Sequence, residues 1–202
     1  LPEGSKVTLD VNENRLLVKV NKSKFTLQTL PAQDFPKVLE QLEQAVKVQI
    51  EQDKLKKLLG MVQDAMAQQD IRYYLNGVLL VIDGHFLKLI ATDGHRLAYI
   101  VTKLDQEYPK REIILPRKTV NELIKLLAET EEKITLELAE NQVRMTFSNI
   151  VLISKVIDGK FPDYERVIPN YTNQLTLNRI EILQALQRAA ILSNEKFRGV
   201  RF

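Results

Sequence analysis

Residues 90–99 read IATDGHRLAY, and within this segment an apolar strand pattern stops and then starts again at Leu97. A strand that breaks its alternation to place several polar side chains together usually presents them to a partner. The alternative is a β-bulge whose arginine is only solvated. The side chains gathered at the break are Thr92, Gly94, His95 and Arg96.

Two apolar runs precede this break, at 78–82 and 86–91, and Asp83-Gly84 lies between them. Asp-Gly is typical of tight hairpin turns, so we predict a turn there. The three strands expected in this part of the chain are therefore about 71–82, 86–92 and 96–104.

Composition is that of a globular protein: 202 residues, 45% hydrophobic and 27% charged. No apolar run approaches membrane-spanning length, and no segment resembles a signal peptide. The absence of cysteine excludes disulfides and thiolate metal sites, which favours a cytoplasmic protein. A net charge of +3 permits nucleic-acid contact without indicating it. The terminal residues look like strand interior, so we interpret the chain as a fragment of something longer.

An internal repeat divides the chain. KVTLDVNENRLLVKVNKSKFTLQTLPAQDFP (6–36) has the same order of strands, Glu-Asn turn and final Phe-Pro as KITLELAENQVRMTFSNIVLISKVIDGKFP (133–162). The apolar helix positions near 55–62 recur 127 residues later, near 182–189. We therefore predict the C-terminal part of one unit at 1–45, a complete unit at 46–172 and the N-terminal part of another at 173–202.

The complete unit is itself double. A strand at 46–50, a helix at 53–68 and three strands are followed by a strand at 112–115, a helix from Pro116 to about 129, and strands at 133–139, 142–148 and 150–157. This repeated β-α-β-β-β order predicts an α+β fold, with two antiparallel β-sheets and two helices packed on the same side. An unrelated α+β domain is the alternative, although it leaves the doubling unexplained.

Both expected helices are amphipathic. Asp53 is the expected N-cap of the first, which buries Leu55, Leu58, Leu59, Val62 and Met66, and the second buries Val120, Leu123, Ile124 and Leu127. Their polar faces mix lysines with acids, which is more often a solvated surface than a nucleic-acid surface. Such a diluted surface suits loose contact with phosphates rather than base reading.

A third helix is expected from Asn178, which pairs with Glu181 as in a capping box. If its repeat-related apolar positions face inward, Ile191 lies about half a turn away from them. Arg188 and Leu192 lie near Ile191, so these three residues form a candidate subunit contact. The alternative is that the truncated third unit covers this face.

Catalytic patterns are not found. The sequence has two histidines, His85 and His95, and no Gly-rich phosphate loop, HExxH or GxSxG motif. We predict no catalytic residues, no metal and no cofactor, and hence a binding and scaffolding protein.

Four motifs, in this order, closely resemble the bacterial DNA polymerase III β subunit, the sliding clamp: DIRYYLNG (70–77), ATDGHRLA (91–98), DGKFPDY (158–164) and LSNEKFRGV (192–200). The resemblance covers the whole chain and implies the DNA-clamp fold, with the two helices on the inner side of a ring. It also implies a non-catalytic processivity factor, which encircles duplex DNA as a head-to-tail homodimer when full length. The fragment would then comprise the end of domain 1, all of domain 2 and the start of domain 3.

The resemblance implies partners and site residues. The implied partners are double-stranded DNA, a clamp-loader complex, the DNA polymerase III α subunit and other proteins that insert a short Gln- and Leu/Phe-bearing peptide. The peptide pocket maps to Leu75, Thr92, Gly94, His95, Arg96, Leu97, Pro162, Arg166 and Val167. Duplex contacts map to Gln69, Arg72, Tyr73, Tyr74, Lys56, Lys57, Lys118 and Lys125, and dimer contacts to Arg188, Ile191 and Leu192. Part of the family's pocket wall lies beyond these residues, so the fragment alone is expected to bind such peptides weakly or not at all.

Two rival interpretations are distinguishable. A repeat-domain scaffold that never encircles DNA would share the fold without needing a basic inner surface. A hydrolase would use His95 with Asp93 or Asp163, and His95→Ala would have to abolish an activity.

Overall fold

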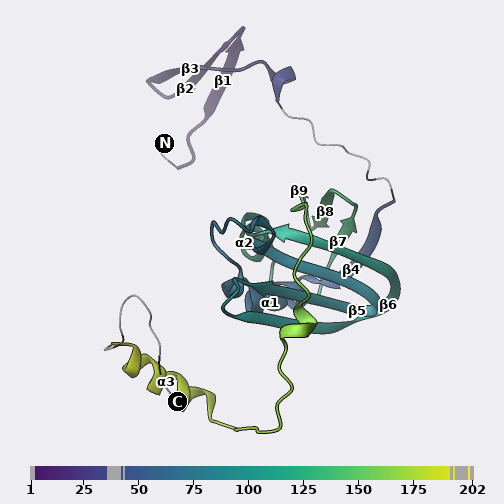
Figure 1. Cartoon of the computed structure of the whole chain (residues 1–202). Coiled ribbons are helices and arrows are strands. Elements are labelled where there is room, and N and C mark those ends of the chain that lie inside the picture. Colours follow the sequence, from purple (N-terminus) through teal and green to yellow (C-terminus); the bar gives the residue numbers. More distant parts are fainter. Residues whose placement is uncertain (1–2, 36–41, 43, 192, 194–199, 201–202) are drawn as a thin grey trace. The chain divides into compact units, whose positions relative to one another are not determined.

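The computed structural model describes residues 3–35, 42, 44–191, 193 and 200 (Figure 1). The chain divides into two compact units, 1–161 and 162–202, which are described separately. No helix among the described residues is long and apolar enough to cross a membrane.

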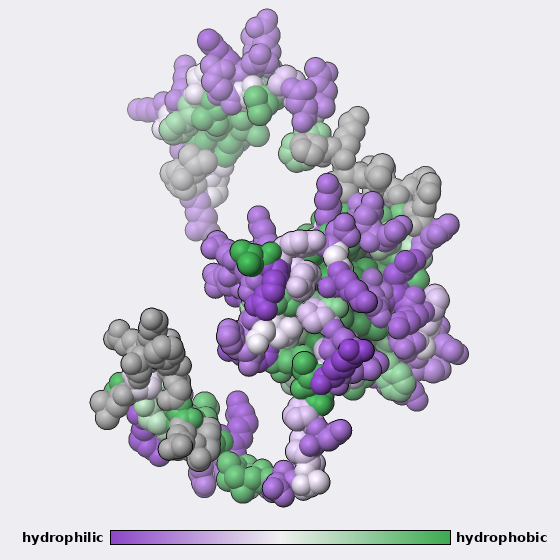
Figure 2. All heavy atoms as spheres, viewed as in Figure 1, coloured by the Kyte–Doolittle hydropathy of each residue, from purple (hydrophilic) through white to green (hydrophobic). Residues whose placement is uncertain are grey.

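Three antiparallel strands open the first unit: β1 (Val7–Asn12), β2 (Arg15–Val20) and β3 (Ser23–Gln28), followed by the short 3-10 helix η1 (Ala32–Asp34). One face of this sheet is apolar, because the paired positions Leu9, Val18 and Phe25 share it. Figure 2 shows that face in green.

The central part of the first unit contains a four-stranded antiparallel sheet in the order β4-β7-β8-β9. Its strands are β4 (Val46–Glu51), β7 (Lys133–Leu138), β8 (Gln142–Phe147) and β9 (Ile150–Lys155). Strands β7, β8 and β9 have the same lengths and pairing order as β1, β2 and β3, so the predicted repeat is present in the secondary structure.

Two long strands form a separate antiparallel ribbon, β5 (Gly77–Thr92) and β6 (Leu97–Pro116). The predicted turn at Asp83-Gly84 is wrong, because both apolar runs belong to the single strand β5. Gly84 pairs with Tyr108 and has a φ of +56°, and the register shifts on both sides of it. Asp83-Gly84 is therefore a bulge within a continuous ladder, and the hairpin turn lies at 93–96.

The strand expected from about 71 begins at Gly77, because Tyr73–Leu75 forms the 3-10 helix η3. Likewise, β6 joins the strands expected at 96–104 and 112–115.

The helices α1 (Gln52–Val62) and α2 (Arg117–Leu126) contact each other, and both pack against β5 and β6, which confirms that they share one side (Figure 1). Helix α1 ends earlier than predicted and continues as the 3-10 helix η2 (Gln63–Ala65). Its N-cap is Glu51 rather than Asp53, and Pro116 is the N-cap of α2 rather than its first residue. The predicted apolar faces are correct, with Leu59 and Val120 fully buried and Ile124 partly buried.

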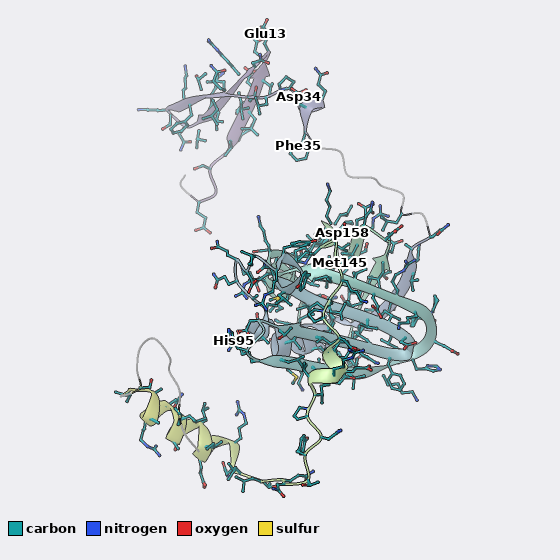
Figure 3. The ribbon with its side chains drawn as sticks, viewed as in Figure 1. Glu13, Asp34, Phe35, His95, Met145 and Asp158 are labelled. Carbon is teal, nitrogen blue, oxygen red and sulfur yellow. The ribbon has the colours of Figure 1, made fainter. Side chains whose placement is uncertain are left out.

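The core of the central part lies between these helices and the two sheets. Val48, Leu89, Leu136 and Met145 are each 2% exposed or less. Figure 3 shows Met145 inside the central part. This packing fixes the two ends of the β5–β6 ribbon, and therefore the position of its 93–96 turn.

The second unit contains the 3-10 helix η4 (Tyr164–Val167) and the helix α3 (Arg179–Ile191). Asn178 caps α3 as predicted, because its side-chain oxygen accepts the backbone N–H groups of Ile180 at 2.9 Å and Glu181 at 3.3 Å. Helix α3 has no buried residue: Ile182 and Leu186 are half-buried and Ala189 is exposed.

Candidate functional site

The turn between β5 and β6 is held by the carboxylate of Asp93. One of its oxygens accepts the backbone N–H groups of His95 and Arg96 at 2.9 and 3.0 Å, and the other accepts Nε of Arg96 at 3.1 Å. Burial raises the pKa of Asp93, but these hydrogen bonds outweigh it and the pKa is lowered overall. The turn is thus closed by a carboxylate that stays ionised.

Thr92 closes the turn from the other side. Its hydroxyl donates to the carbonyl oxygen of Arg96 at 2.7 Å and accepts the N–H of Gly94 at 3.1 Å. Gly94 has a φ of +88°, in the left-handed region that favours glycine. The side chains of His95 and Arg96 are exposed on this backbone, and Figure 3 shows His95 at the edge of the central part. Leu97, the first residue of β6, is half-buried.

The loop before β5 is held by Asn76. Its side chain accepts the N–H of Asp70 at 3.0 Å and donates to the carbonyl oxygen of Asp70 at 2.9 Å. Leu75 in η3 is only 2% exposed, so its side chain is part of the core surface beneath this loop rather than open to a ligand.

Arg72 joins this loop to the turn. Its guanidinium forms a two-pronged pair with Asp70, with Nε–Oδ1 at 3.0 Å and Nη2–Oδ2 at 2.8 Å. The same Nη2 donates to the carbonyl oxygen of Asp93 at 3.3 Å. The side-chain hydrogen bonds from Arg72 lower the pKa of Asp70 from 3.8 to about 2, and Asp70 in turn raises the pKa of Arg72.

Two tyrosines extend the same loop. The rings of Tyr73 and Tyr74 meet edge to face, with centroids 5.8 Å apart, and Tyr73 is 57% exposed. Gly159 lies against them: a Cβ there would be 3.3 Å from the Tyr73 ring. The two rings therefore pack against each other and against Gly159 at this loop.

A cavity of about 560 Å³ lies beside the turn and the loop. It is lined by His95 and Arg96 from the turn, Asp70 from the loop and Arg117 from α2, among others. Its walls are mainly polar, so it suits polar groups better than the apolar side chains of a peptide.

An open depression of about 500 Å³ brings together three of the predicted duplex contacts, Gln69, Lys118 and Lys125. Lys125 pairs with Glu122 at 3.0 Å, and Lys56 on α1 pairs with Glu129 at 3.4 Å. Lys57 and Lys118 are exposed and make no ion pair with any described residue. The predicted basic residues therefore differ in how much of their charge is available to a phosphate.

The remaining predicted site residues lie in the second unit. Pro162 is exposed, Arg166 pairs with Asp163 at 2.7 Å, and Val167 is 65% exposed. In α3, Arg188 is exposed and Ile191 is 79% exposed, while Leu192 lies outside the described residues.

Sequence reasoning missed the residues that support the site. Sequence analysis assigns Asp70 and Asn76 no role beyond their motif, assigns Asp93 only to the rival hydrolase, and does not single out Arg117, which donates to the carbonyl oxygen of Met66 at 3.1 Å. The short-range signal was present for Asp93, because an aspartate two or three residues before the amides it accepts is typical of an Asx turn. No such short-range signal was present for Arg117.

The carboxylate of Asp93 is engaged within the turn rather than with the ring of His95. The Asp93 carboxylate is occupied by backbone N–H groups and Arg96, and no described residue hydrogen-bonds to the ring of His95. Among the described residues, no group of three or more His, Asp or Glu is placed to hold a metal ion. The site offers a hydrogen-bonded polar turn, the exposed ring of Tyr73 and lysines, which are binding features.

Comparison with known proteins gives one consistent family. A family model described as the central domain of the DNA polymerase III beta subunit matches residues 49–163. The beta sliding clamps of Vibrio cholerae and Escherichia coli K12 are 45% and 42% identical to this chain over 202 residues. Each match covers 100% of this chain but 55% of the relative, so the chain spans about half the length of these proteins.

Solved structures agree in fold. The DNA polymerase III subunit beta from Pseudomonas aeruginosa superposes with a TM-score of 0.89 at 43% identity, covering 98% of this chain and 55% of that one. A sliding clamp from the same organism bound to griselimycin gives a TM-score of 0.87 at 44% identity, covering 98% of this chain and 54% of that one. The Bacillus subtilis clamp gives 0.83 at 31% identity, covering 94% and 50%.

Proposed function

This chain belongs to the DNA polymerase III beta subunit family, and from that premise we propose that it is part of a DNA sliding clamp. The clamp is a ring-shaped homodimer that encircles duplex DNA and has no catalytic activity of its own. It tethers replicative and repair polymerases, and a clamp loader places it on DNA. The observation that supports this most directly is that the family match, 49–163, includes the 92–97 turn, the 69–74 loop and both lysine-bearing helices.

Retention on DNA in this proposal follows from topology. A closed ring cannot leave a duplex sideways, so strong binding to DNA is unnecessary. Exposed lysines interspersed with acids give weak phosphate contacts that exchange readily. Gln69, Arg72, Tyr73 and Tyr74 contact the duplex at the rim, and Lys56, Lys57, Lys118 and Lys125 face it from the two helices.

Tethering in this proposal uses a peptide pocket next to the 92–97 turn. Thr92 to Arg96 form its polar rim, Leu97, Pro162 and Val167 receive apolar side chains, and Arg166 is assigned to the same pocket. Leu75 supports the pocket from beneath, since its side chain is buried. The pocket lies between the complete unit at 46–172 and the one that begins at 173, and Arg188, Ile191 and Leu192 form the dimer contact.

The test of the pocket compares the two histidines. In the full-length protein, the affinity for a short fluorescein-labelled peptide bearing Gln, Leu and Phe is measured by polarisation. We expect His95→Ala to weaken binding by about fivefold or more, the cost of truncating an energetically important interface residue. His85→Ala, also exposed but in the middle of β5, serves as the control and should bind normally. Equal affinities for both variants and the unmodified protein would refute the pocket assignment.

A further inference from the structure

Arg72 contacts two parts of the chain that are distant in sequence. It belongs to the 69–74 loop, yet its Nη2 donates to the carbonyl oxygen of Asp93, twenty-one positions further on. The side chain is 46% exposed, so part of it remains open to solvent. The bond from Arg72 Nη2 to the carbonyl oxygen of Asp93 joins this loop to the turn.

Asp70 determines where that guanidinium points. A carboxylate that accepts Nε and Nη2 in parallel fixes the plane of an arginine, which a single hydrogen bond does not do. Asp70 also accepts the backbone N–H of Arg72 at 2.8 Å, and its own backbone is held on both sides by Asn76. The chain Asn76–Asp70–Arg72 is therefore fixed up to the point where it meets the turn.

Gly94 is where the guanidinium meets the turn. A Cβ at this position would lie 3.0 Å from Nη1 and 3.1 Å from Nη2 of Arg72, closer than normal contact. The end of the guanidinium thus lies against the Asp93-Gly94 backbone, in space that a Cβ at position 94 would crowd.

We propose that Asp70 is a positioning residue: it holds Arg72 against the Asp93-Gly94 backbone and so keeps the 92–97 turn in the shape that accepts a peptide. The inference rests on the proposed function. Arg72 is also a proposed duplex contact. Asp70 and a DNA phosphate compete for the same guanidinium, so the carboxylate favours peptide binding and opposes DNA binding at this loop.

The test uses Asp70→Asn, which keeps the shape of the side chain and removes its charge. We expect about fivefold weaker binding of the labelled peptide, the lower range of a typical coupling between sites. Binding of a short labelled duplex should stay equal or become tighter, because Arg72 is released. Asp105→Asn is the matched control, since it removes an exposed carboxylate paired with Lys133 at 3.1 Å.

Weaker peptide binding without weaker duplex binding distinguishes positioning from simple loss of structure. If Asp70 only stabilised the fold, both affinities and the thermal midpoint would fall together, and that outcome would overturn the inference. Arg72→Lys is the second variant: it loses the two-pronged pair but keeps a positive charge for phosphate, so it should weaken peptide binding by a larger factor than duplex binding.

A spectroscopic measurement tests the role of Asp70 even if no peptide binds. Failure of peptide binding to the unmodified protein would count against the proposed function and not against this role of Asp70. Asp70→Asn should shift the backbone amide signals of Gly94 and His95 in a ¹H–¹⁵N spectrum, and Asp105→Asn should not. Unchanged turn signals in Asp70→Asn would overturn the inference.

Discussion

The four lysines proposed to face DNA differ in charge availability, and this difference gives a quantitative prediction. Lys57 and Lys118 have no ion-pair partner among the described residues, whereas Lys56 and Lys125 are paired with Glu129 and Glu122. A lysine that is already paired with a carboxylate neutralises less phosphate charge. Fewer counterions are therefore released from the DNA when it binds. Neutralising the unpaired lysines should therefore change the salt dependence of duplex binding more than neutralising the paired ones.

The magnitude follows from counterion release. Each phosphate contact contributes about 0.9 to the slope of log affinity against log salt, so Lys57→Gln with Lys118→Gln should reduce the slope by about 1.8 per chain. Between about 50 and 200 mM salt, a slope change of about 1.8 corresponds to about tenfold less loss of affinity for each chain that contacts the duplex.

The assay is fluorescence anisotropy of a labelled duplex over a series of salt concentrations. The matched control is the double variant Lys56→Gln with Lys125→Gln, which removes the same number of charges and should change the slope less. An added variant, Glu122→Gln, releases Lys125 and should steepen the slope. If both double variants change the slope equally, or if Lys57→Gln with Lys118→Gln leaves it unchanged, the ranking of these duplex contacts by ion pairing is wrong.

Three further predictions concern the site and the second unit. Leu75→Ala should lower the free energy of unfolding by about 2–5 kcal/mol in denaturant titration, because the side chain is 2% exposed; a loss below that range would mean that Leu75 is accessible. The carboxylate of Asp70 should titrate with a pKa of about 2 by NMR rather than 3.8. Because its folded pKa is lowered, the stability it contributes is complete above the ordinary value and is lost as pH falls toward the folded value, and Asp70→Asn should remove that part of the acid sensitivity. Ile191→Glu should convert the full-length protein from dimer to monomer in light scattering, since Ile191 is 79% exposed; a stable dimer would exclude this surface.

Features encoded by short-range periodicity were predictable from the sequence. The apolar face of α1 follows from the spacing of Leu55, Leu58 and Leu59, and Asn178 was recognisable as a helix cap because a cap bonds to amides only two or three residues away. The side-by-side helices followed from the doubled order of strands and helices.

Features that depend on distant partners were not predictable. Asp83-Gly84 and Asp93-Gly94 are the same dipeptide between apolar runs, yet the first is a bulge and the second begins a hairpin turn. What distinguishes them is the strand opposite: Gly84 pairs with Tyr108, far along β6, and nothing local indicates it. The bond from Arg72 to the carbonyl oxygen of Asp93 is of the same kind, because it depends on how the loop and the turn are brought together.

The proposed clamp holds DNA by enclosing it. The most direct measurement loads the full-length protein with its clamp loader on a nicked circular plasmid, removes free protein by gel filtration, and then linearises half of the sample with a restriction enzyme. Enclosure predicts that the protein stays with the circle and slides off the linear DNA. Equal retention on both forms would contradict it and would favour a scaffold that binds DNA, or its partners, without forming a ring around it.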